Sequence, residues 1–245
     1  MTRAIHMLFA IICYGIFFAT FLYLIAFVGN FSIVPLTVDR GPAAPLATSV
    51  IIDLALIALF GVQHSVMARK GFKSAWTKIV PAYVERSLYV LFASVALVVL
   101  YLFWHPIHST IWDVSAPALR SVLWGIFWIG WLLVLVSTFL MNHFELFGLQ
   151  QAWLHTSDRA QQAPRMREPS LYRFVRHPMM LGFFLAFWSI PTMSAGHLLL
   201  AAGMSVYILI ALHYEERDLV GMFGADYESY RGRVGMLLPR LRSRA

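Results

Sequence analysis

Long apolar stretches alternate with short polar segments along the chain. Five of these stretches reach the roughly 17–25 residues that a helix needs to cross a lipid bilayer, and they predict transmembrane helices at about 6–29, 48–68, 83–104, 120–141 and 195–212. A shorter apolar stretch at 179–190 predicts one further helix. The pattern therefore predicts an all-α, polytopic membrane bundle of five long helices with a short helical-hairpin arm.

The polar segments divide this predicted bundle without separating a soluble domain from it. We expect one integral-membrane domain over residues 1–245, made of a four-span bundle at 1–145, an interfacial connection at 146–175, and a hairpin with a polar tail at 176–245. Within the connection, residues 146–154 are predicted to form an amphipathic helix that lies in the membrane interface.

Composition and charge agree with a membrane protein. The chain is 60% hydrophobic and 13% charged, whereas soluble domains carry about 25% charged residues. Its net charge of +7 is concentrated in short segments beside the spans, which indicates membrane orientation and argues against a nucleic-acid partner. The single cysteine, Cys13, excludes a disulfide framework and a thiolate metal cluster. No feature points to a protein partner.

The basic residues also predict the topology. Four of them follow the second span with no acidic residue before Glu85, namely Arg69, Lys70, Lys73 and Lys78. Such a cluster is typical of a cytoplasmic loop. Both termini are therefore expected on the cytoplasmic side.

The hairpin is bounded by charged and polar motifs. It opens with Arg176-His177-Pro178 and ends with Glu215-Glu216, and no Asp, Glu, Lys or Arg lies between His177 and Tyr214. His177 should be extended because a proline follows it, and Pro178 should begin the helix. Two helices of opposite direction would return the glutamates to the membrane face of Arg176. The resulting cationic and anionic walls suit a zwitterionic amino acid; a simple interfacial salt bridge is the alternative.

Polar groups from other spans are predicted at the same membrane face. His64 lies near the end of the second span and Asn142-His143 follows the fourth, which places them on the cytoplasmic side with the hairpin motifs. Since polar groups within a membrane are costly and usually face a cavity or a partner, one cytoplasmic-side active site is expected. Asp53 lies about 16 Å along the helix from His64, too far to be its partner. Asp53 could form a structural hydrogen bond within the bundle or have a functional role.

The hairpin motifs resemble the isoprenylcysteine carboxyl methyltransferase and phospholipid methyltransferase superfamily, whose members are integral-membrane enzymes that use S-adenosyl-L-methionine. The resemblance covers roughly the last third of the chain. It implies that the cofactor site is lined by Arg167, Tyr172, Arg176, His177, Pro178, Gly182, Glu215 and Glu216. One departure is Met180, which stands where these enzymes often have a tyrosine.

Two segments nearer the N-terminus, GVQHSVMAR at 61–69 and NHFELFGLQQ at 142–151, resemble the bacterial methanethiol S-methyltransferases, which make dimethyl sulfide. This resemblance implies an enzyme of the bacterial inner membrane that methylates a small thiol, methanethiol. A thiol is a poor nucleophile until it is deprotonated, so His64 or His143 is the expected base, with Gln63 and Asn142 orienting the ring and the substrate. The alternative is that both histidines only hydrogen-bond helix ends.

Three other functions stay open on the sequence. The first is methylation of a prenylcysteine carboxylate or a lipid headgroup by the same superfamily. The second is a membrane haem or metal protein, which nine histidines suggest, although no Glu-x-x-His or His-Glu-x-x-His motif is present and no metal site is predicted. The third is a membrane reductase that uses a nicotinamide.

Overall fold

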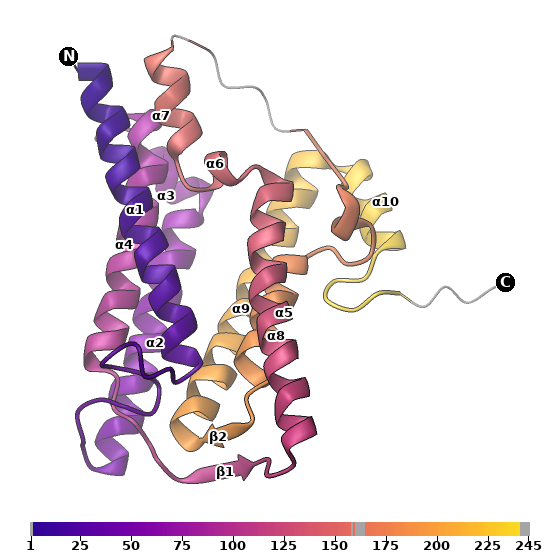
Figure 1. Ribbon diagram of the computed structural model, residues 1–245. Helices are drawn as coiled ribbons and strands as arrows, with labels where there is room; N and C mark the ends of the chain where they lie inside the picture. Colours follow the sequence, from indigo (N-terminus) through magenta and orange to yellow (C-terminus); the bar gives the residue numbers. More distant parts are fainter. Residues whose placement is uncertain (1, 158, 160–164, 241–245) are drawn as a thin grey trace, which may run out of the picture. The chain divides into compact units, whose positions relative to one another are not determined.

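The computed structural model describes residues 2–157, 159 and 165–240, and most of the regular structure in them is helical (Figure 1). Within these residues, five helices are long and apolar enough to cross a membrane: α1 (Thr2–Val28), α2 (Leu46–Ala68), α4 (Ala82–Phe103), α5 (Pro117–Met141) and α9 (Ala195–Phe223). The apolar helix α8 (Pro178–Trp188) has only 11 residues. The predicted all-α fold is confirmed, and the protein is an integral membrane protein.

Prolines mark where several of these helices begin. Pro117 and Pro178 occupy the first turns of α5 and α8, where a backbone N–H would have no helical partner. Pro45 directly precedes α2. His177 has φ −128° and lies outside the helical region, as predicted from the clash between a proline and the residue before it.

The helices differ from the prediction at their polar ends. Helix α9 extends to Phe223, beyond the predicted end at Leu212. The prediction ended too early because hydropathy indicates where the chain leaves the membrane, and a helix can continue beyond that point. The interfacial helix predicted at 146–154 is divided by Gly148, which has φ 89°, into two short helices, α6 (His143–Leu146) and α7 (Leu149–Thr156). Three polar elements were not predicted: α3 (Lys70–Trp76), the 3-10 helix η1 (Ser170–Arg173) and α10 (Ala225–Arg233).

A small sheet lies in segments between the predicted helices. Strand β1 (Thr110–Asp113) pairs antiparallel with β2 (Thr192–Ser194). The side chain of Thr192 donates a hydrogen bond to Asp113 Oδ1 at 2.7 Å. The sheet fixes the start of α9, which follows β2 directly.

The chain divides into two compact units. Unit 1 comprises Met1–Val114, His143–Gln162 and Pro191–Met204. In it α1 and α2 pack against α4, and α7 packs against α1 (Figure 1). Near the first interhelical loop its core is aromatic, with Phe27 packed against Tyr101 and Trp104.

Asp53 belongs to this core. It is fully buried in α2, and its Oδ1 accepts a hydrogen bond from the backbone N–H of His105 at 2.9 Å. This bond ties the segment that follows α4 to the middle of α2. Of the two roles open for Asp53, the structure thus shows the structural hydrogen bond.

Unit 2 comprises Ser115–Asn142, Ala163–Ile190 and Ser205–Ala245. Its main contact is between α5 and α8 (Figure 1). The two backbones approach most closely at Gly130 and Gly182, where a Cβ on either glycine would lie 2.6 Å from the carbonyl oxygen of the other. Small residues permit such approach between membrane helices. Gly182 therefore has a packing role in unit 2.

Replacing Gly182 by alanine is expected to destabilise the protein by about 1–3 kcal/mol, because the added methyl group meets rigid backbone atoms of α5 and the helices must separate. Gly125→Ala is the matched control, since a Cβ at that position of α5 meets no atom within 4 Å. The measurement is the thermal unfolding midpoint in detergent. Equal midpoints for the two variants would contradict the packing role.

Candidate active site

Arg176, His177 and Glu216 form a buried polar cluster in unit 2. Arg176 Nε and Nη2 lie 2.7 Å and 2.6 Å from Glu216 Oε1, and His177 Nε2 lies 3.1 Å from the same oxygen. The side chains of Arg176 and Glu216 are only 7% and 12% exposed. The structure thus brings three of the predicted site residues together, and the salt bridge considered as the alternative for Arg176 is present.

The C-terminal tail fixes the backbone of this cluster. The N–H of Arg176 donates to the carbonyl of Gly235 at 2.8 Å, and the N–H of His177 donates to the carbonyl of Met236 at 3.1 Å. These bonds hold the segment before α8 against the residues that follow α10. The tail is therefore part of the site and not an appendage.

The guanidinium of Arg176 is fully engaged by the protein. Its Nη1 donates to the carbonyl oxygens of Val234 at 2.5 Å and Arg231 at 3.3 Å, while its other two nitrogens contact Glu216. Arg176 therefore fixes both the tail and the orientation of Glu216.

A pocket of about 330 Å³ adjoins Glu216. Its volume falls at the lower end of the range of about 300–1,000 Å³ seen for small-molecule sites. The lining comes from one face of α9 and from the tail, and it carries both signs of charge: Leu209, His213, Glu216, Arg217, Arg231 and Met236. Glu215 is exposed and does not line the pocket, so the structure distinguishes the two glutamates.

Tyrosines enclose the region beside the glutamates. Tyr230 is buried on α10 and donates its hydroxyl to the carbonyl of Tyr172 at 2.6 Å. Burial, reinforced by Glu168, raises the pKa of Tyr230 to about 12. Burial, reinforced by Glu215, also raises the pKa of Tyr172. Both hydroxyl groups therefore stay protonated at neutral pH.

Tyr227 is a site residue that the sequence analysis missed. Its side chain is buried on α10, and its hydroxyl has no hydrogen-bond partner among the residues that the structure describes. Burial and the nearby Glu216 raise its pKa, so the hydroxyl is a neutral donor beside the cluster. Helical spacing could have found the pocket residues, because Leu209, His213 and Arg217 lie on the face of α9 that Glu216 occupies.

The other predicted cofactor residues lie in different places. Arg167 is exposed in the segment before η1, and among the described residues it makes no hydrogen bond or ion pair with the cluster. In the same segment, Glu168 forms an ion pair with Arg233 at 2.9 Å. Pro178 starts α8 and Gly182 packs on α5, as described above.

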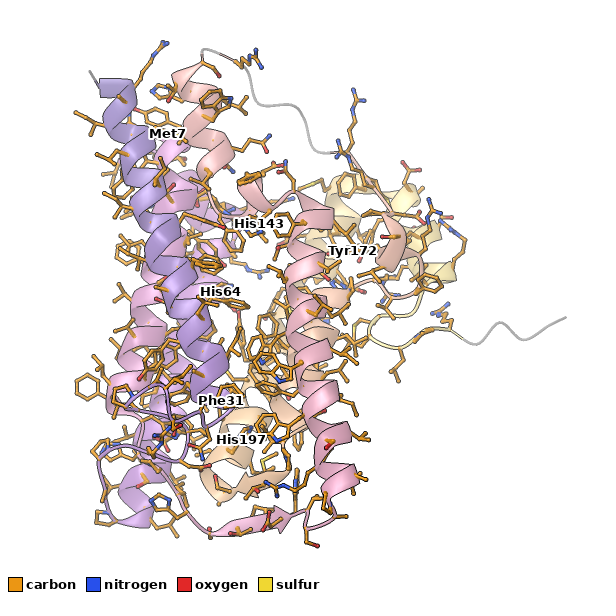
Figure 2. All side chains as sticks on the ribbon, viewed as in Figure 1. Met7, Phe31, His64, His143, Tyr172 and His197 are labelled. Atoms are coloured by element: carbon orange, nitrogen blue, oxygen red, sulfur yellow. The ribbon has the colours of Figure 1, made fainter. Side chains whose placement is uncertain are left out.

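The two candidate bases lie in unit 1, and each is paired with a tyrosine. His64 Nε2 is 2.7 Å from the hydroxyl of Tyr89, and His143 Nε2 is 2.8 Å from the hydroxyl of Tyr14. Figure 2 shows the two histidines at neighbouring levels of unit 1, between Met7 and Phe31. Neither tyrosine was predicted as a partner.

The two histidine–tyrosine pairs share one apolar cluster. Tyr89 is buried with Met67, Val90 and Phe147, and Tyr14 packs against that group. The ring of His143 lies 4.8 Å from that of Phe147. The structure therefore brings both predicted bases to one cluster in unit 1.

His143 is suited to accept a proton. It lies just after α5, and its burial lowers its pKa, so the imidazole is neutral at pH 7. Because Nε2 lies against the Tyr14 hydroxyl, Nδ1 can accept a proton only in the tautomer in which Nε2–H donates to the tyrosine oxygen. The same rule applies to His64 and Tyr89.

Gln63 and Asn142, which were predicted to orient the imidazoles, lie near the C-terminal ends of α2 and α5. The Nε2 of Gln63 lies 3.1 Å from Met67 Sδ, one turn along α2. Asn142 caps the end of α5 in a left-handed conformation with φ 87°. Each imidazole has a tyrosine hydroxyl within hydrogen-bond distance of its Nε2.

Among residues 2–157, 159 and 165–240, no group of three or more His, Cys, Asp or Glu side chains is arranged to hold a metal ion. The histidines of the candidate site contact tyrosine or glutamate instead.

Comparison with known proteins connects these features to a family. The family described as NnrU protein matches residues 53–231, from the middle of α2 into α10. Methanethiol S-methyltransferase of Mycobacterium tuberculosis is 51% identical over 239 residues, which cover 98% of each chain. The chain belongs to the NnrU protein family.

Other relatives agree with this placement. Methanethiol S-methyltransferase 1 of Bradyrhizobium diazoefficiens is 49% identical over 98% of this chain and 84% of its own length. Human nurim is 33% identical over 74% of this chain and 70% of its own. No solved structure matches the chain.

Proposed function

We propose that this protein is a membrane S-methyltransferase that converts methanethiol to dimethyl sulfide with S-adenosyl-L-methionine as the methyl donor. The observation that carries this proposal is the identity of 42–51% to six proteins named methanethiol S-methyltransferase, over 88–99% of the chain. At 98% coverage, the aligned regions span the histidine segments of unit 1 as well as the hairpin of unit 2.

The cluster around Glu216 fits the proposed donor. The pocket carries cationic and anionic side chains, which matches a ligand with both a carboxylate and an ammonium group. The buried hydroxyl of Tyr227 has no hydrogen-bond partner among the described residues and can donate to the ligand. Glu216, oriented by Arg176 and His177, is the residue that we expect to accept a hydrogen bond from the donor. When bound, the donor supplies an electrophilic methyl group on a sulfonium.

The histidines of unit 1 are the proposed bases. The reactive form of the acceptor is the thiolate, because a thiol of cysteine type has a pKa near about 8.5. His64 or His143 takes the proton from sulfur while the tyrosine holds the opposite ring nitrogen. The thiolate sulfur then bonds to the methyl carbon as the methyl–sulfonium bond breaks, and both products are neutral thioethers.

Headspace analysis tests the proposed reaction. Bacteria that express the protein and are supplied with methanethiol should release dimethyl sulfide, whereas cells with an empty vector should not. Membranes of the same cells are assayed in parallel with prenylcysteine and with phospholipid as acceptors. Methyl ester or methylated lipid without dimethyl sulfide would assign the protein to another branch of the superfamily.

We further propose that the protein lies in the bacterial inner membrane with both termini in the cytoplasm, on the strength of the basic cluster that follows α2. The only native cysteine, Cys13, is buried, so introduced cysteines can be labelled selectively. An impermeant maleimide should label Ala43→Cys in spheroplasts, and Lys78→Cys only after permeabilisation; both positions are exposed. The reverse labelling pattern would overturn this topology.

A further inference from the structure

Arg86 on α4 lies against the His64–Tyr89 pair and was not singled out from the sequence. Its Nε donates to the carbonyl of Leu146 at 2.7 Å, and its guanidinium carbon lies 4.8 Å from the centre of the Tyr89 ring. The guanidinium is also close enough to His64 to interact with it electrostatically. Arg86 thus shares its surroundings with one of the two candidate bases.

Among the described residues, only one nitrogen of this guanidinium has a hydrogen-bond acceptor. Within the described part of the chain, the carbonyl of Leu146 is the only hydrogen-bond acceptor that Arg86 contacts. The side chain is nevertheless half-buried. A partly desolvated guanidinium with free donors is a favourable partner for an anion.

A second cation lies near Arg86. Burial together with the Arg86 charge lowers the pKa of Lys73 on α3. Glu85 is buried and interacts electrostatically with Lys73. Arg86 and Lys73 are therefore two neighbouring cations, and an anion bound beside them would reduce their mutual repulsion.

We propose that Arg86 binds the acceptor as a thiolate, beside His64. The inference rests on the proposed function and names a catalytic residue for it. The S–H bond breaks, the proton passes to the imidazole nitrogen of His64 opposite the Tyr89 hydroxyl, and both bonding electrons stay on sulfur, where the guanidinium balances the negative charge. When the sulfur becomes a neutral thioether, this attraction is lost and the product can leave.

The apolar groups nearby define the class of acceptor. Tyr89, over whose ring the guanidinium lies, is buried with Met67, Val90 and Phe147, so the surroundings of the cation on this side are apolar. A small alkyl group is stable there, whereas a charged substituent would be desolvated without a partner. The expected acceptors are small, uncharged alkyl thiols.

The test compares Arg86→Gln and Arg86→Lys with the wild type. Arg86→Gln should lower kcat/KM for methanethiol at pH 7 about ten- to a hundredfold, the value of a hydrogen bond to a charged group. Arg86→Lys keeps the charge and should recover part of this loss. The affinity for S-adenosyl-L-methionine, measured by calorimetry, should stay within twofold. Lys78→Gln removes an exposed basic residue outside this cluster and is the matched control.

Acceptor acidity separates this role from a structural one. The loss of kcat/KM in Arg86→Gln should shrink as the pH rises. It should also be smaller for 2,2,2-trifluoroethanethiol than for the less acidic ethanethiol. In both cases a larger fraction of the thiol is already ionised in solution. A defect that is equal at every pH and for both thiols, or a parallel loss of donor affinity, would overturn the role of Arg86. Normal kcat/KM in Arg86→Gln would overturn it and leave the proposed function intact, whereas a wild type that methylates no thiol overturns both.

Discussion

Replacing Glu216 by alanine is expected to weaken the binding of S-adenosyl-L-methionine at least tenfold and to destabilise unit 2. The binding loss follows from removal of a charge-assisted hydrogen bond, worth about 1.5–3 kcal/mol. The stability loss follows from Arg176, which would keep its charge at 7% side-chain exposure without the carboxylate that now contacts two of its nitrogens. Removing one partner of a buried ion pair lowers the free energy of unfolding by about 3–5 kcal/mol.

Two variants separate the binding effect from the stability effect. Glu215→Ala removes an exposed carboxylate one residue away on the same helix and should change both quantities little. Arg176→Ala combined with Glu216→Ala leaves no unpaired charge, so it should be more stable than Glu216→Ala alone while donor binding stays weak. Donor affinity is measured by calorimetry and stability by thermal unfolding without the donor. Unchanged donor affinity in both Glu216→Ala and Arg176→Ala would exclude this cluster as the donor site.

Loss of the base is expected to lower turnover by about 10²–10⁴-fold, the usual contribution of general base catalysis. His64→Ala is the first variant and His143→Ala the second, and donor affinity should be nearly unchanged in both. The loss should shrink as the pH rises, because more thiol ionises in solution without help. Burial lowers the pKa of His143, so its basic form is present at pH 7 and is lost only as the pH falls through that lowered pKa.

The tyrosines offer a second test of the base. Tyr89→Phe and Tyr14→Phe keep the packing of each ring but remove the hydroxyl that fixes the imidazole, so each should impair turnover less than loss of its histidine. Added imidazole should restore part of the activity of the histidine variant that lacks the true base. His108→Ala, at an exposed loop position, is the control. Near-normal turnover at pH 7 in both His64→Ala and His143→Ala would mean that the thiolate enters from solution.

The helices of the fold were predictable because membrane spans are long and apolar. Hydropathy located all five long helices and α8, and the proline rule placed His177 outside the helical region. The extension of α9 to Phe223 could not be predicted in this way, since a helix that leaves the membrane continues with polar residues. The same extension carries Arg217 to the pocket.

The candidate site was predictable where its residues lie in recognisable motifs. The sequence motifs predicted Arg176, His177 and Glu216, and the structure places these three side chains in contact. The partners of the histidines depend on tertiary structure instead. Tyr14 and His143 are 129 positions apart, and tyrosines are too common in membrane helices for either one to be singled out.

The most direct test of the proposed function follows the methyl group itself. Purified protein in detergent is supplied with methanethiol and with S-adenosyl-L-methionine that carries a deuterated methyl group, and the volatile products are analysed by mass spectrometry. We expect dimethyl sulfide with one deuterated methyl group, formed in a one-to-one ratio to the donor consumed, and at least tenfold less from Glu216→Ala at a donor concentration below the dissociation constant. Unlabelled dimethyl sulfide, or none while the folded wild-type protein binds the donor, would contradict thiol methylation by this protein.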